Sequence, residues 1–110
     1  MSLKLPPTQA AIRLAFQAAN AESNGEAVIQ IVDYIQQQRI LIEQYDYILI
    51  FSVLRQHTKF ADKAVEILYA CHDNNEKLPL LCYGMAMINL QKARDWRKAI
   101  HLLLHVLNYF

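Results

Sequence analysis

Strong helix breakers are scarce in this chain, and their scarcity limits the possible folds more than any other feature of the sequence. The 110 residues include only two glycines and three prolines, while 55% of the residues are apolar. Sandwiches and barrels need many tight turns, and tight turns draw on glycine and proline. An apolar chain with so few breakers favours long helices. The sequence therefore predicts an all-α protein.

Apolar residues recur at helical spacing in six segments. The expected helices cover roughly residues 9–21, 26–38, 43–57 and 59–72, with a fifth starting near Pro79 and a sixth near Asp95. Thr8 and Asp95 are expected N-caps, and Ser23-Asn24-Gly25 is the clearest turn. Six helices with short connections predict three antiparallel hairpins.

The third segment, residues 43–57, is apolar on nearly every side. A helix of this kind is buried against several neighbours. The β-branched and aromatic residues of 45–53 also permit a strand there. No turn signal or hairpin partner flanks that stretch, so a helix is the preferred interpretation and the strand stays an alternative.

The net charge, the lengths of the apolar runs and the residues at the two termini narrow the class of protein further. The net charge is only +1, from 11 basic and 10 acidic residues, whereas a protein that binds duplex nucleic acid usually carries a marked basic excess. No apolar run approaches the ~18 residues of a membrane span, and residues 1–7 lack the apolar core of a secretory signal. We expect a single domain, residues 1–110, in the cytoplasm or nucleus. Its apolar end, residues 106–110, is compatible with a piece of a longer protein.

Residues that could carry chemistry are present, but they do not form a recognisable site. Cys71 and Cys82 are expected to be buried free thiols. His101 and His105 have the i, i+4 spacing of helical metal ligands, but no third ligand is obvious. The scattered carboxylates are expected on solvated faces; they are Asp33, Glu43, Asp46, Glu66 and Asp73. The sequence therefore predicts no enzyme, no metal and no cofactor.

A short pattern recurs at the start of every second helix. Polar residues are followed by alanine and a β-branched residue in three segments, Gly25-Glu26-Ala27-Val28, Asp62-Lys63-Ala64-Val65 and Arg97-Lys98-Ala99-Ile100. The alanines are spaced by 37 and 35 residues. A small residue at this point lets two antiparallel helices approach closely, and Phe60 and Trp96 are expected to fix the crossing. The spacing predicts a repeat protein.

The segment Gln91–Ile100 resembles the corner between the two helices of pentatricopeptide and tetratricopeptide repeats. Residues 45–79 also have the 35-residue length of a pentatricopeptide repeat. This resemblance covers residues 8–110 as three degenerate helix pairs, and it implies a short right-handed solenoid with a concave ligand face. Pentatricopeptide proteins contact single-stranded RNA through polar residues near the start of each first helix. Leu49 and Gly84 occupy those positions here, so we expect a protein or peptide ligand instead.

Two regions are candidate partner surfaces. One is the corner around Trp96, where Lys92, Arg94, Arg97 and Lys98 cluster. This corner could bind single-stranded RNA or an acidic peptide, or Trp96 could be buried between helices with the charges solvated. The other is the last helix, which is apolar on more than one face although a terminal repeat helix normally needs a polar outer face.

We therefore expect a non-catalytic interaction module that binds a protein or peptide, or that forms a homodimer through its C-terminal helix. A single-stranded RNA-binding module that uses the basic corner is the alternative. The predicted partner-binding residues are Leu103, Leu107, Tyr109, Phe110, Trp96, Arg94 and Arg97.

Overall fold

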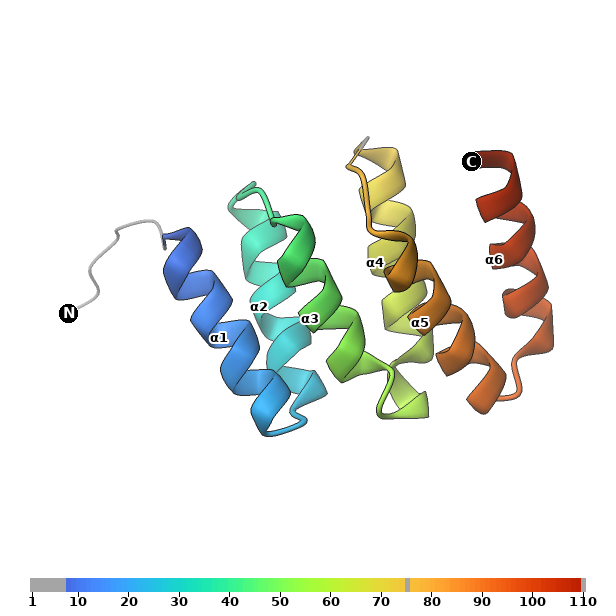
Figure 1. The fold of residues 1–110 in the computed structure, drawn as a ribbon, viewed down its shortest axis with the longest axis horizontal. Helices are drawn as coiled ribbons and strands as arrows, with labels where there is room; N and C mark the ends of the chain where they lie inside the picture. The colour runs from blue at the N-terminus through green and yellow to red at the C-terminus, as the bar shows by residue number, and fades with distance from the viewer. Residues whose placement is uncertain (1–7, 75, 110) are drawn as a thin grey trace.

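Six α-helices in series form the fold of the part of the chain that the structure describes (Figure 1). The computed structural model describes residues 8–74 and 76–109, and within these ranges it contains α-helices, one short 3-10 helix and no strand. The elements are α1 (Gln9–Ala21), α2 (Gly25–Gln37), α3 (Gln44–Leu54), the 3-10 helix η1 (Thr58–Phe60), α4 (Ala61–Asp73), α5 (Leu80–Lys92) and α6 (Trp96–Tyr109). The all-α prediction is confirmed. The strand alternative for residues 45–53 is wrong, because α3 occupies that segment.

Side-chain caps start three of the helices, as the turn residues indicate. Thr8 Oγ1 accepts a hydrogen bond from the Ala11 N–H at 3.1 Å, and Asn24 Oδ1 accepts one from the Ala27 N–H at 3.1 Å. Asp95 Oδ1 accepts one from the Lys98 N–H at 3.3 Å. Each bond satisfies a donor that has no partner within the first helical turn. The caps expected at Thr8 and Asp95 are confirmed.

The helices form two rows, with consecutive helices antiparallel (Figure 1). The first row contains α1, α3 and α5, and the second row contains α2, α4 and α6. In the first row α3 packs directly against both α1 and α5, whereas the helices of the second row pack only sparsely against one another. The stack measures 47 × 29 × 19 Å. It therefore has one tightly packed row and one more open row.

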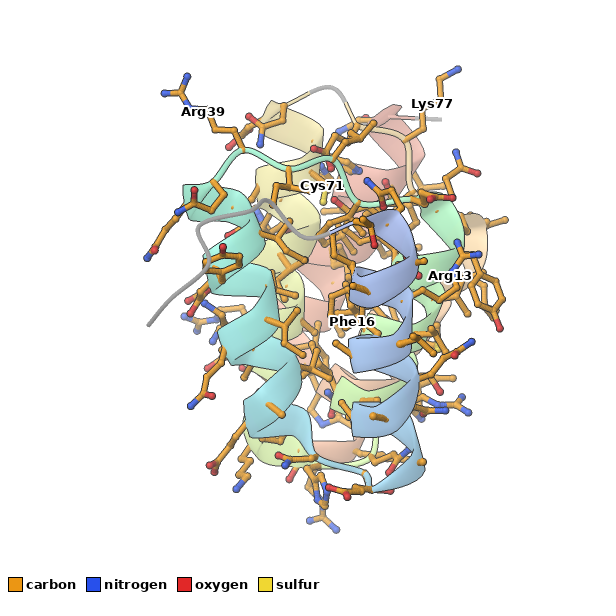
Figure 2. All side chains as sticks on the ribbon, turned by 90° about the vertical axis from the view of Figure 1, so that its left-hand side faces the viewer. Arg13, Phe16, Arg39, Cys71 and Lys77 are labelled. Carbon is orange, nitrogen blue, oxygen red and sulfur yellow. The ribbon has the colours of Figure 1, made fainter. Side chains whose placement is uncertain are left out.

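The core fills the space between the two rows. Its largest fully buried side chains include Phe16 on α1, Phe51 on α3 and Leu90 on α5. Figure 2 shows Phe16 pointing inward from α1, while Arg13 projects from the opposite side of that helix. α3 is buried nearly all round, as predicted, because it lies between two neighbours in its row and faces the second row. Among the described side chains of α6, only Leu102 is fully buried.

Gly25 allows the first pair of helices to pack against the second. It is buried in the first turn of α2, and a Cβ built there would lie 2.3 Å from Cε2 of Phe60. No positive φ is involved, so the need for glycine is steric. Phe60, in η1, is itself buried at this junction between the two pairs. Its expected role in the crossing of α3 and α4 stays a prediction. The extra 3-10 turn at residues 58–60 also explains why the helix predicted from residue 59 begins at Ala61.

Candidate interaction surface

The largest group of exposed apolar side chains on one helix of the described residues lies along α6. It consists of Trp96, Ile100, Leu103, Leu104 and Leu107, which are between 42% and 65% exposed. We call this surface the α6 face. Steps of four, three and four residues connect Trp96, Ile100, Leu103 and Leu107, so they line one side of the helix. The predicted partner residues Leu103 and Leu107 lie on this face. The side chain of Tyr109 and the whole of Phe110 lie outside the described part of the chain.

Trp96 does not fix the crossing of α5 and α6, and the prediction that it does is wrong. Its side chain is 56% exposed, whereas Phe60 at the preceding corner is 7% exposed. The two corners differ because a 3-10 turn places Phe60 against Gly25, while Trp96 is the first residue of α6 and faces outward with Ile100. The interpretation in which Trp96 is buried between helices is therefore also wrong, and Trp96 is available to a partner.

The basic cluster at this corner is smaller than the sequence indicates. Lys92, Arg94 and Arg97 are exposed. Lys98, in contrast, pairs with Asp62 on α4 and with Asp95 Oδ2 at 3.5 Å, and the bond to Asp62 raises the pKa of the Lys98 ammonium. The charge of Lys98 is therefore largely compensated within the chain. The predicted residues Arg94 and Arg97 remain accessible beside Trp96.

Ion pairs bridge the open second row. Lys59 Nζ lies 3.3 Å from Glu26 Oε1, between η1 and α2. Lys63 Nζ lies 3.3 Å from Asp33 Oδ1, and Lys98 connects α6 to α4 through Asp62. We call these contacts the ion-pair bridges. They connect helices whose backbones approach one another at only a few points.

Asp46 is buried, and the prediction that it lies on a solvated face is wrong. The residue is 0% exposed in the first turn of α3, where its Oδ1 accepts a hydrogen bond from Arg13 Nε at 3.0 Å. Arg13 also reaches Glu43 Oε2 at 3.2 Å, and the bond to Asp46 raises the pKa of the Arg13 guanidinium. The carboxylate is buried because α1 packs directly over the start of α3, and Arg13 compensates its charge.

Two histidines and a tyrosine join the last three helices. Nδ1 of His72 on α4 is in hydrogen-bond contact with Nε2 of His105 on α6, and Nε2 of His72 contacts the hydroxyl of Tyr83 on α5. The two imidazole rings stack with centroids 4.5 Å apart. His101 does not join this stack, and its ring lies edge-on to Tyr69 at 6.2 Å. The sequence missed the cluster, because His72 and His105 are 33 residues apart and only the packing of α6 brings them together.

Acidification is expected to destabilise the protein through His72. Burial and the neighbouring His105 lower the pKa of His72 below its ordinary value of 6.5, although Asp73 opposes the shift. Below that value the unfolded chain binds a proton that the folded chain does not, so the free energy of unfolding should fall. Urea titrations at about pH 7.5 and about pH 5.5 would measure the change. The change should shrink in His72→Gln and persist in His57→Gln, which alters an exposed histidine. Equal changes in both variants would contradict this prediction.

Both thiols are expected to be unreactive in the folded protein. Cys71 and Cys82 are free and buried, as predicted. Burial raises the pKa of each thiol to about 12, so almost none of the reactive thiolate is present near neutral pH. Ellman's reagent at about pH 8 should label the native protein only as fast as it opens, and should label both thiols at once in urea. Rapid labelling of either cysteine without denaturant would contradict the buried placement.

The positions expected to contact RNA bases lack polar side chains. Leu49 is buried within α3, so it cannot reach a ligand. Gly84 is exposed on α5, and no other residue lies within 4 Å of a Cβ built there. Neither residue can recognise a base edge through its side chain.

The architecture defines the class of protein. Three antiparallel helix pairs in series, each with an alanine near the start of the second helix, form a helical-repeat protein. The family model for pentatricopeptide repeat-containing proteins matches residues 10–106, and the chain belongs to this family. Such repeats are generally non-catalytic modules that bind RNA or protein. The comparisons with curated proteins and with solved structures found no match.

Among the described residues, no three His, Cys, Asp or Glu side chains are grouped closely enough to hold a metal ion. Within the same part of the chain, no helix has the length and apolar character needed to cross a bilayer.

Proposed function

We propose that this chain is a non-catalytic interaction module that binds a protein or peptide partner, or a second copy of itself, through the α6 face. The observation that carries the proposal is the accessibility of five large apolar side chains on one helix. Contiguous apolar surface of this kind is rare on soluble proteins unless another molecule covers it. Trp96 at one end of the face is the residue type that most often dominates binding energy.

Charged residues beside the α6 face support a protein ligand. Arg94 and Arg97 are exposed next to Trp96, so an apolar centre has a basic border at its N-terminal end. Protein interfaces commonly combine an apolar core with a polar rim, and arginine is enriched in them. The partner that fits is therefore an apolar helix or peptide with acidic residues near one end.

The proposal is tested by partner capture with matched variants. Immobilised wild-type chain, Leu103→Asp and Leu41→Asp would be compared, followed by rebinding of each captured protein after its purification. Leu41 is 65% exposed in the connector between α2 and α3, so it controls for the loss of an exposed leucine. We expect Leu103→Asp to lose the partner and Leu41→Asp to keep it, with unchanged circular dichroism for both. Equal capture by Leu103→Asp and wild type would overturn the proposal.

Exposure of Trp96 also favours a second candidate, a module that binds single-stranded RNA. An accessible tryptophan between Arg94 and Arg97 can stack on a base while the arginines contact phosphates. Fluorescence anisotropy with a labelled single-stranded RNA, over a salt series starting at ~50 mM, would test it. Binding that weakens steeply with salt and disappears in Trp96→Ala would support this candidate. No binding at the lowest salt would exclude it.

A further inference from the structure

The α6 face has a counterpart inside the molecule, on α4. A shift of 35 residues, which superposes Ala64 on Ala99, relates four residues of the face to four of α4. Trp96, Ile100, Leu103 and Leu107 correspond in this register to Ala61, Val65, Leu68 and His72. The α4 residues are 9% exposed or less, and α5 packs on α4, where Tyr83 contacts His72. The α6 face is thus the side of a second-row helix that a first-row helix covers elsewhere in the chain.

α1 presents the matching open side of a first-row helix. A shift of 71 residues superposes the N-caps Asn24 and Asp95 and relates α1 to α5. Ala11, Leu14, Ala15 and Ala18 then correspond to Cys82, Met85, Ala86 and Asn89. The α5 residues are at most 3% exposed, and Asn89 Nδ2 donates to the Leu54 carbonyl of the preceding pair at 3.0 Å. On α1, Ala11, Leu14 and Ala18 are exposed.

The two open sides also suit one another in size. The α1 side is small apart from Leu14, whereas the α6 face consists of bulky residues. Small residues let helix backbones approach, and bulky residues opposite them fill the space between the helices. α5 already uses two small residues, Cys82 and Ala86, on the side that it turns toward the preceding pair.

Charged residues near the start of the second-row helices fit the same alignment of two copies. Within the chain Asp62, two residues before Ala64, pairs with Lys98, one residue before Ala99. Arg97 lies two residues before Ala99, and Glu26 lies one residue before Ala27. Packing α1 and α2 of a second copy beyond α6 therefore brings Glu26 of that copy opposite Arg97, with the signs reversed but still complementary.

We propose that copies of this chain associate head to tail, with α1 of one copy packed on the α6 face of the next as α5 packs on α4. This inference rests on the proposed function and names a second copy as the partner. The contact joins two different surfaces, so it leaves a free α1 side and a free α6 face after every addition. Assembly therefore grows with concentration and does not stop at a dimer. A symmetric contact between two α6 faces would stop at two copies.

Sedimentation velocity of the purified 110-residue chain separates these arrangements, with concentrations from roughly micromolar to roughly millimolar. Three variants are needed: Leu14→Asp blocks the α1 side, Leu103→Asp blocks the α6 face, and Leu41→Asp is the control. Leu14, like Leu41, is 65% exposed, so the substitutions should leave the fold intact, which circular dichroism would verify. We expect wild type and Leu41→Asp to grow beyond a dimer. Leu14→Asp and Leu103→Asp should each stay monomeric at 12.8 kDa.

Mixing the two blocked variants is the decisive step. Leu14→Asp keeps its α6 face and Leu103→Asp keeps its α1 side, so an equimolar mixture should form a one-to-one dimer and nothing larger. Dimers of Leu14→Asp alone would overturn the head-to-tail contact in favour of a symmetric one. Wild type that stays monomeric throughout would also overturn it. In that case, loss of a captured partner by Leu103→Asp and its retention by Leu14→Asp would still support the proposed function.

Discussion

Phe51→Ala is expected to lower the free energy of unfolding by about 3–5 kcal/mol. Phe51 is 1% exposed on α3, the helix that packs against both other first-row helices. Truncation removes the ring and leaves a cavity that these neighbours cannot fill without moving. A domain of this size is stable by about 5–15 kcal/mol, so the variant should lose a large share of its stability.

Urea denaturation followed by far-UV circular dichroism measures this loss. Phe51→Leu serves as the matched control, since it keeps most of the apolar volume and should lose much less stability. A loss below about 1 kcal/mol for Phe51→Ala would show that the side chain is not packed in the core.

Gly25→Ala is expected to destabilise the protein by about 1–3 kcal/mol. The added Cβ would meet three ring carbons of Phe60 at 2.3–2.8 Å, so either the ring or α2 must move. Phe60→Leu removes the outer ring atoms, and the double variant should therefore be more stable than the sum of the two single changes indicates. A double-mutant cycle in urea measures this coupling.

Gly84→Ala provides a control of opposite sign. No residue lies within 4 Å of a Cβ at this exposed helical position, so alanine should stabilise α5 by up to about 1 kcal/mol.

The double-mutant cycle has its own contrary outcome. If the effects of Gly25→Ala and Phe60→Leu on the free energy of unfolding were strictly additive, the two residues would not be in steric contact.

Local patterns predict the helices well, because helical periodicity and caps depend on neighbours within a few residues. Thr8 and Asp95 cap helices where the sequence places them. The boundary near Phe60 was harder to predict, since a buried ring against Gly25 stabilises a 3-10 turn there. That contact joins residues far apart in sequence, and no local pattern reports it.

The candidate surface was predictable where it depends on one helix and not where it depends on several. Leu103 and Leu107 belong to a helix with more apolar sides than one neighbour can cover, and both are exposed. The placement of Trp96 was not predictable, because the family-like corner motif does not fix which side the aromatic ring takes. Asp46 was missed for a related reason, since its burial depends on Arg13 from another helix pair.

The two rows of helices give the stack an uneven stiffness. The first row is held by close apolar packing, which resists both compression and separation. In the second row the ion-pair bridges connect α2 to η1 and α4, each worth at most about 1 kcal/mol at a surface and weakened by salt, whereas α4 and α6 are also joined by the stack of His72 on His105. We therefore expect bending that spreads α2 from α4 to meet less resistance than stretching of the first row. We expect one edge of the stack to be stiffer than the other, and the separation of α2 from α4 to depend on ionic strength.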